Sequence, residues 1–235
     1  GKILGLLCIW VGLPPEVVLK TEGRLFSIFA SQSAVALENA RLHQDLLRNY
    51  FDTVRALVVA IDAKDPYTRN HSENVMNITL SITHQIGLEP EKQEDMKLAG
   101  LLHDIGKIGV RTETLRKEEA LNEEDRREIQ QHPEVGAKII STVGHLHRLH
   151  PIILHHHERF DGRGYPHGLK GEQIPLGARI IAVADAFDAI TSSRCYRPAK
   201  SRDDAMAEMK REAGFQFDPR LLEAFFHTKW FTGEP

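Results

Sequence analysis

The chain has 235 residues, of which 30 are basic and 33 acidic, and its formal net charge at pH 7 is -3. This length allows one large domain or two small ones, and 41% hydrophobic with 27% charged residues is typical of a soluble globular protein. The nearly balanced charge argues against broad binding to nucleic-acid polymers or membranes, and no apolar run has the length of a membrane span.

The two cysteines, Cys8 and Cys195, are far apart and match neither a disulfide pattern nor a metal-binding spacing. They fit a reducing compartment, so we expect a cytoplasmic protein, and no signal-peptide pattern is present. The chain begins at Gly1 inside an apolar pattern, which predicts that it is a piece of a longer protein.

The N-terminal part predicts a strand followed by one very long helix. Residues 2–11, KILGLLCIWV, are short and apolar, and glycine and proline follow them. Between Gly23 and Pro66 there is neither glycine nor proline, and apolar residues recur every three or four positions in a stripe that includes Phe29, Leu37 and Leu47. Over residues 25–50 this stripe favours pairing with a second copy of the chain over packing on its own domain. Residues 51–64 are expected to pack within the following domain.

Residues 1–48 resemble the end of a GAF-type sensor domain. The resemblance lies in GLLCIWV followed by LFSIFASQSAVALENARL, which match its last strand and closing helix. It implies that residues 1–48 are the tail of a sensor domain that also carries the dimer helix, and that residues 49–235 form a second domain.

From Asp65 onward the pattern predicts helix after helix, and therefore a mainly α fold. Asn122 and Asp218 are predicted to cap two of these helices, because each precedes a first turn with acidic residues or proline. A loop rich in glycine and proline is expected over 161–177. The predicted helices are 70–87, Pro90 to His103–Asp104, a segment from Asn122, 134–142, 148–158, 178–192, 202–212 and 219–230.

The stretch LLHDIGK at 101–107 places a histidine and an aspartate at the end of an apolar run. His103 and Asp104 offer an imidazole nitrogen and a carboxylate to one or two metal ions. Gly106 is expected to end the helix in a left-handed conformation, and Lys107 adds a mobile charge suited to a phosphate. Taken alone the pair is a weak signal, since the chain holds 13 histidines.

Further residues of metal-ligand type lie on or at the ends of the predicted helices: His71, His132, His156, His157 and Asp185. Asp185 is the most informative, because its helix is otherwise apolar and an unpaired buried carboxylate is costly. One division of these ligands puts one ion on His71, His103 and Asp185. It puts the second on His132, His156 and His157, with Asp104 bridging both. Ordinary alternatives stay open: His71 could be a helix-surface residue, His132 could mark a helix joint, and His155 is ambiguous.

Four segments resemble the HD-GYP family, a subgroup of HD-domain phosphohydrolases that degrade cyclic di-GMP: HSENV at 71–75, HDIGK at 103–107, HHERFDGRGYP at 156–166 and IPLGARIIAVADAFDAITSSRCYR at 174–197. The resemblance implies an HD-superfamily helical bundle whose metal ligands are the seven residues above. Some members hold a third metal with a glutamate four residues before the first histidine. Tyr67 stands there, so we expect two divalent ions, most readily iron or manganese, with zinc or nickel also suitable.

The resemblance implies hydrolysis of cyclic di-GMP to linear pGpG, GMP or both, by a hydroxide that bridges the two metals. The metals and Lys107 would neutralise charge on the phosphate. The resemblance further implies substrate contacts from the loop residues Gly164, Tyr165 and Pro166 and from Arg194 and Arg197. Without the resemblance, the loop is equally consistent with an ordinary surface turn, and the two arginines are consistent with a solvated basic stretch.

Other functions stay open at this point. The substrate could be another cyclic dinucleotide, such as cyclic GMP-AMP. The domain could instead be a non-catalytic sensor, or could dock on a diguanylate cyclase with a GGDEF domain. A di-iron oxygenase is disfavoured by Lys107 and the loop, and a monophosphate hydrolase of the wider HD superfamily is a further alternative.

Overall fold

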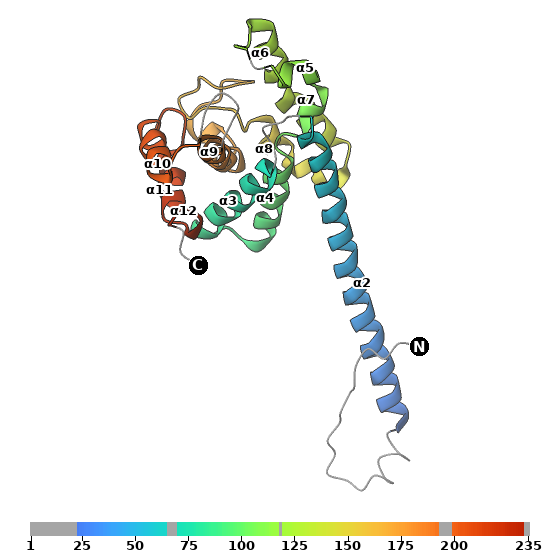
Figure 1. Ribbon diagram of the computed structural model, residues 1–235. Coiled ribbons are helices and arrows are strands. Elements are labelled where there is room, and N and C mark those ends of the chain that lie inside the picture. Colours follow the sequence, from blue (N-terminus) through green and yellow to red (C-terminus); the bar gives the residue numbers. More distant parts are fainter. Residues whose placement is uncertain (1–22, 65–69, 118, 193–198, 233–235) are drawn as a thin grey trace. The chain divides into compact units, whose positions relative to one another are not determined.

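The computed structural model describes residues 23–64, 70–117, 119–192 and 199–232 (Figure 1). Within these ranges the chain is helical and has no β-sheet, which confirms the predicted α fold. The strand expected over 2–11 lies outside the described residues. The chain divides into two compact units, Gly1–Arg55 and Ala56–Pro235.

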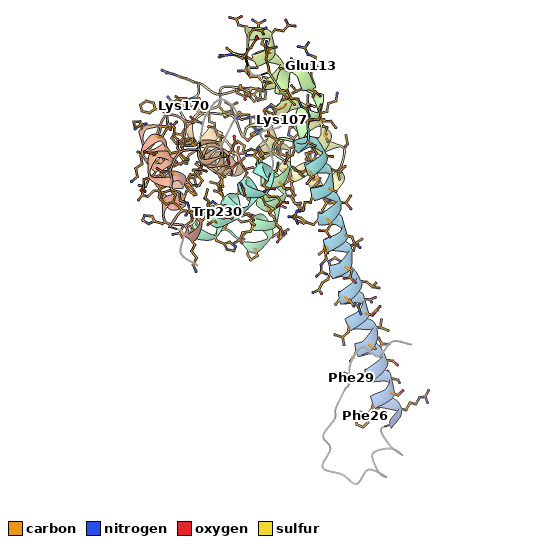
Figure 2. The ribbon with its side chains drawn as sticks, viewed as in Figure 1. Phe26, Phe29, Lys107, Glu113, Lys170 and Trp230 are labelled. Carbon is orange, nitrogen blue, oxygen red and sulfur yellow. The ribbon has the colours of Figure 1, made fainter. Side chains whose placement is uncertain are left out.

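Helix α2 (Gly23–Asp62) runs for 40 residues, as the absence of glycine and proline predicted. In the first unit many of its large apolar side chains are exposed, and Figure 2 shows Phe29 on the first turns of the helix. Leu37 and Leu47, which belong to the same predicted stripe, are 59% and 53% exposed. None of the helices in the described ranges combines the length and the hydropathy that a membrane crossing requires.

The second unit is a bundle of short helices in which α3, α4 and α9 pack on one another. Helix α7 packs against η1 and α8, and α11 packs against α3 and α9. The elements are α3 (His71–Gln85), α4 (Pro90–Leu102), η1 (Ile105–Gly109), α5 (Thr112–Leu115), α6 (Glu123–Gln130), α7 (His132–Ser141), η2 (Gly144–Leu149), α8 (His150–Leu154), η3 (Gly171–Gln173), α9 (Leu176–Thr191), α10 (Arg202–Arg211), α11 (Pro219–Phe226) and α12 (Lys229–Thr232).

The core of this unit follows from the spacing of its apolar residues. Val75, Ile78 and Ile82 recur every three or four positions, so they share one face of α3, and all three are buried. Helix α9 is apolar on most sides, and its Ile180 and Ile181 are fully buried. Burying a side chain of this size contributes about 1.5–3 kcal/mol, so α3 and α9 are held firmly where they carry site residues.

Both predicted helix caps are present. The Asn122 side chain accepts the N–H of Asp125 at 2.8 Å, and the Asp125 carboxylate accepts the N–H of Asn122 at 3.1 Å. Asp218 accepts the N–H of Arg220, the second residue of α11, at 2.9 Å. These bonds satisfy amide groups that have no partner inside the helix.

Two predicted helices are shorter than expected. The segment 148–158 forms η2 and then α8, which ends at Leu154, so His155, His156 and His157 follow the helix in a turn. The helix predicted over 219–230 breaks between α11 and α12. There the Thr228 hydroxyl donates to the carbonyl oxygen of Phe225 at 2.7 Å, and such a local bond competes with continued helix.

Gly106 is required for packing and not for a left-handed turn. The residues with positive φ do not include it, so the expected left-handed helix end is wrong. It lies inside η1, where an added Cβ would come within 1.8 Å of the His132 carbonyl oxygen and 2.5 Å of the Gly136 amide nitrogen. Only glycine lets η1 approach α7 this closely, and this approach sets the distance between Asp104 and His132.

Gly106→Ala is expected to lower the free energy of unfolding by about 1–3 kcal/mol, the usual cost of overpacking. The added methyl group must push η1 away from α7, because backbone atoms surround it. Urea denaturation followed by circular dichroism measures the change. Gly144→Ala is the matched control, since a Cβ there meets nothing within 4 Å. Equal stability of the two variants would contradict this account.

Candidate metal centre

His71 is the first residue of α3, and its buried ring is held from behind by a carboxylate. Its Nδ1 lies 2.7 Å from Oδ2 of Asp188 on α9, and the Asn74 amide donates to the other oxygen of Asp188 at 2.7 Å. A carboxylate accepts, so the proton of this bond is on Nδ1. Nε2 of His71 therefore faces the other way, toward Asp185 at 3.3 Å and Asp104 at 3.8 Å.

Three further histidines, His103, His132 and His156, are oriented in one common way. Each Nδ1 donates to the carbonyl oxygen three residues earlier: Gly100 at 2.8 Å, Ile129 at 2.7 Å and Ile153 at 2.7 Å. A carbonyl oxygen only accepts, so Nδ1 carries the proton and Nε2 keeps a free lone pair. This is the tautomer that binds a metal ion through Nε2.

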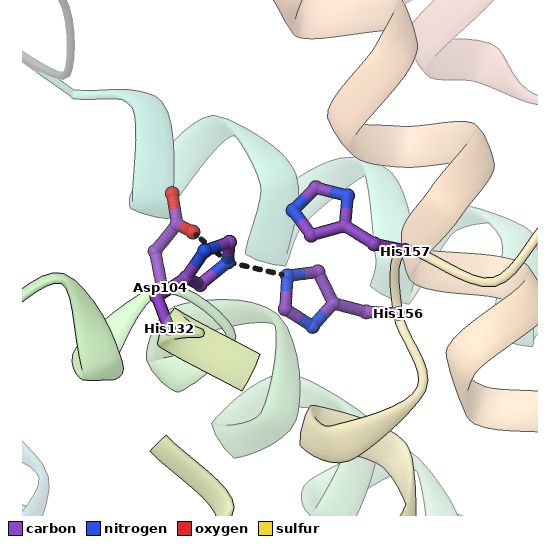
Figure 3. A group of neighbouring side chains, drawn as sticks. All are labelled: Asp104, His132, His156 and His157. Carbon is purple, nitrogen blue, oxygen red and sulfur yellow. Dashed lines mark hydrogen bonds and ion pairs between the residues drawn. The ribbon is translucent and has the colours of Figure 1, made fainter. Parts of the chain in front are cut away.

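Asp104 lies between two groups of histidines. Its Oδ1 is 3.2 Å from Nε2 of His132, whereas its Oδ2 is 3.4 Å from Nε2 of His103. On one side, Asp104, His132, His156 and His157 bring their ligand atoms within 4.8 Å of one another (Figure 3). On the other side, His71, His103 and Asp104 do the same. The carboxylate belongs to both groups, with one oxygen turned to each.

These side chains fit metal ions, because the buried Nε2 lone pairs of the histidines point toward one another. Nε2 of His132 and Nε2 of His156 are 3.2 Å apart, although the Nδ1 atoms hold the protons. Nε2 of His103 is buried and has no hydrogen-bond partner among the described residues. Opposed lone pairs repel unless a positive charge lies near them, and a divalent cation supplies that charge.

Asp185 joins the His71 side of the centre. It projects from the middle of α9, and its Oδ1 lies 3.3 Å from Nε2 of His71. The structure thus brings all seven predicted ligands, which are spread from residue 71 to residue 185, to one place. His157 and His156 can both face it because α8 ends before them.

Burial keeps three of the histidines neutral. Burial is the main cause of a lowered pKa in all three. The pKa of His103 is lowered, that of His156 lies well below its usual value, and that of His157 is lowered to about 3. Neutral imidazole is the form that coordinates a metal ion, so these three rings need not lose a proton at neutral pH.

Asp104 and His71 are charged, because neighbouring groups outweigh the effect of burial on each of them. Burial raises the pKa of Asp104, but the Lys107 ammonium outweighs it and holds the pKa well below the usual range. Burial lowers the pKa of His71, but hydrogen bonds with Asp185 and Asp188 raise it to about 10. His71 therefore holds an extra proton, which an incoming cation would displace.

Lys107 and Tyr165 border the centre. Nζ of Lys107 lies 2.7 Å from Oδ2 of Asp104. The Tyr165 ring stacks on the His157 ring with centroids 4.9 Å apart and an angle of 28°.

The loop that carries Gly164 passes close to the backbone of Glu158, because a Cβ added at Gly164 would lie 2.5 Å from Cα of Glu158. Pro166 follows Tyr165 in the same wall. Arg194 and Arg197 lie outside the described residues.

Asp188 and Asn74 support the centre, although the sequence analysis gave neither of them a role. The available signal was spacing: Asp188 follows Asp185 by three residues and shares its helix face, and Asn74 lies almost one turn after His71. Only the structure shows that the two meet behind the His71 ring.

Asp188→Asn is expected to weaken metal binding by about 10–100-fold, the usual effect of losing a residue that orients a ligand. The amide keeps the shape of the carboxylate but not the charge that holds Nδ1–H of His71. Competition with a metal chelator measures the affinity for Mn²⁺. Asp203→Asn on the exposed face of α10 is the control. Unchanged affinity in Asp188→Asn would exclude this supporting role.

Comparison with known proteins agrees with this geometry. A family model described as HD domain matches residues 55–221. The cyclic di-GMP phosphodiesterase response regulator RpfG of Xanthomonas campestris is 39% identical over 180 residues, covering 74% of this chain and 46% of the relative. The 3'3'-cGAMP-specific phosphodiesterase 3 of Vibrio cholerae is 37% identical over 195 residues, covering 83% of this chain and 42% of the relative.

The chain spans about half the length of the curated relatives it matches. Among solved structures, a cyclic GMP-AMP specific phosphodiesterase of V. cholerae superposes with a TM-score of 0.62 at 21% identity, covering 78% of this chain and 49% of the other. That likeness concerns the fold alone. The matched family model, the helical bundle and the histidine–aspartate centre show that this chain belongs to the HD domain family.

Proposed function

We propose that this chain is the catalytic part of a metal-dependent phosphodiesterase that hydrolyses cyclic di-GMP to pGpG, GMP or both. The observation that carries the proposal is the position of Asp104, with one carboxylate oxygen turned to each of two histidine groups. Relatives that are named cyclic di-GMP phosphodiesterases support the same reading.

The proposed ligands divide between two ions. His71, His103 and Asp185 would hold one ion, His132, His156 and His157 would hold the other, and Asp104 would serve both. Mixed imidazole and carboxylate donors suit iron or manganese, and also zinc or nickel. When bound, such ions supply Lewis-acid activation of a water molecule and of the phosphate.

The residues of the chain would then position the substrate. Lys107 contacts Asp104 through a flexible side chain, so its ammonium group can move to a phosphate oxygen and neutralise charge as the bond to phosphorus breaks. Tyr165, fixed against His157, offers a ring on which a guanine base can stack. Gly164 and Pro166 shape the same wall, and Arg194 and Arg197 complete the proposed contacts on sequence grounds.

A second substrate deserves the same test. Relatives named 3'3'-cGAMP-specific are similar to this chain to nearly the same degree as those named for cyclic di-GMP. Both dinucleotides carry two phosphodiester bonds and at least one guanine, so the centre described above could act on either one.

We also propose that the N-terminal segment regulates this activity. Residues 1–48 would form the end of a GAF-like sensor domain in a cytoplasmic protein, and α2 would pair with a second copy of the chain. Proteins with a GGDEF domain are the proposed heterologous partners.

Asp104→Ala is expected to abolish cyclic di-GMP hydrolysis, with a loss of more than about a hundredfold, because both ions lose a shared ligand. The protein is loaded anaerobically with Fe²⁺ or Mn²⁺, and the products are separated by chromatography, with cyclic GMP-AMP as a parallel substrate. Asp203→Ala serves as the control. If the fully metal-loaded parent chain binds cyclic di-GMP without cleaving it, the proposed catalysis is wrong and the domain acts as a sensor.

Replacing Leu37 and Leu47 together by glutamate is expected to turn a dimer into a monomer in sedimentation velocity. Both side chains are exposed on α2, and buried carboxylates in a helix pair are costly. Asn39→Glu adds a charge to the same exposed helix but outside the predicted stripe, so it should leave the dimer intact. A parent chain that sediments as a monomer would rule out the helix pair.

A further inference from the structure

A second cluster of metal-ligand type lies beside the centre and shares no residue with it. It consists of His155, Glu158 and His167, whose ligand atoms lie within 4.8 Å of one another. His155 follows the last residue of α8, and His167 lies just beyond Pro166 in the loop. The sequence analysis left His155 ambiguous and gave His167 no role.

His155 presents a free lone pair to His167. Its Nδ1 lies 2.8 Å from the carbonyl oxygen of Pro151, which only accepts, so the proton is on Nδ1 and Nε2 is bare. This is the orientation found for the histidines around Asp104. Nε2 of His155 points at Nδ1 of His167 at 3.0 Å.

Glu158 supplies a buried carboxylate. It is 3% exposed, and its two oxygens accept the N–H groups of His167 at 2.8 Å and Leu169 at 3.1 Å. No lysine or arginine among the described residues forms an ion pair with it. Each oxygen keeps a further acceptor site, and a buried negative charge held only by two amides gains most from a nearby cation.

The distances fit a small borderline ion. Zn–N bonds of about 2.0–2.1 Å at a tetrahedral angle place two nitrogens about 3.3 Å apart. The two imidazole nitrogens are 3.0 Å apart, so the rings need to separate by only a few tenths of an ångström. His167 is exposed and His155 is partly exposed, so an ion can enter from solvent. Two histidines and a glutamate also match a common zinc donor set.

We propose that His155, Glu158 and His167 bind a divalent ion of the Zn²⁺, Co²⁺ or Ni²⁺ class, distinct from the ions around Asp104. This ion ties the turn after α8 to the far side of the loop that carries Gly164, Tyr165 and Pro166. Occupancy therefore stiffens that loop, because both of its ends are then fixed by metal–ligand bonds.

The test counts bound Zn²⁺ in the full chain after equilibrium dialysis against a small excess of the ion. The parent chain is expected to hold one more ion than His167→Ala, and His167→Cys is expected to restore it, because a thiolate replaces the imidazole as a zinc ligand. His84→Ala removes an exposed histidine from α3 and should match the parent. Hydrogen exchange of residues 159–169 is expected to slow on Zn²⁺ addition in the parent but not in His167→Ala.

Equal Zn²⁺ counts in the parent and His167→Ala would overturn the proposal and leave a hydrogen bond between two imidazoles. Failure of His167→Cys to regain the ion would also count against it. Neither result bears on the ions around Asp104, since His167 belongs to neither of those groups.

Discussion

One buried carboxylate constrains the rest of the structure. Asp104 is almost inaccessible, yet it is ionised, and each of its oxygens faces a different set of imidazole nitrogens. A negative charge in such a place is tolerated only where positive charge is close by. Lys107 supplies one positive charge. The imidazole lone pairs around the carboxylate are suited to bind metal cations, which would supply the rest.

The helices meet around this carboxylate mostly through their ends. His71 begins α3, His103 and Asp104 follow α4, His132 begins α7, and His156 follows α8 by two residues. Carbonyl groups in the last turn of a helix lack intrahelical partners. The carbonyl groups that accept the Nδ1 protons lie in the last turns of α4, α6 and α8, so the ligands satisfy the helix ends and the helix ends orient the ligands.

Much of this arrangement was predictable from the sequence. Apolar spacing predicted the long helix and the bundle, and the capping residues Asn122 and Asp218 marked helix starts that the structure confirms. Features that depend on contacts between distant segments were not predictable. The sequence pattern around Gly106 predicts a left-handed helix end, since it contains no sign of the contact with α7. The role of Asp188 depends on a partner 117 positions away.

The way each ring is held also affects how the centre can change during evolution. Main-chain carbonyl groups fix His103, His132 and His156, and no substitution at Gly100, Ile129 or Ile153 removes a backbone oxygen. The ring of His71 is held instead by a side chain, so one codon change at Asp188 can release it. Divergence that changes how a ligand ring is oriented is thus most accessible at His71, through α9, while the orientations of His103, His132 and His156 tolerate substitution of the residues that hold them.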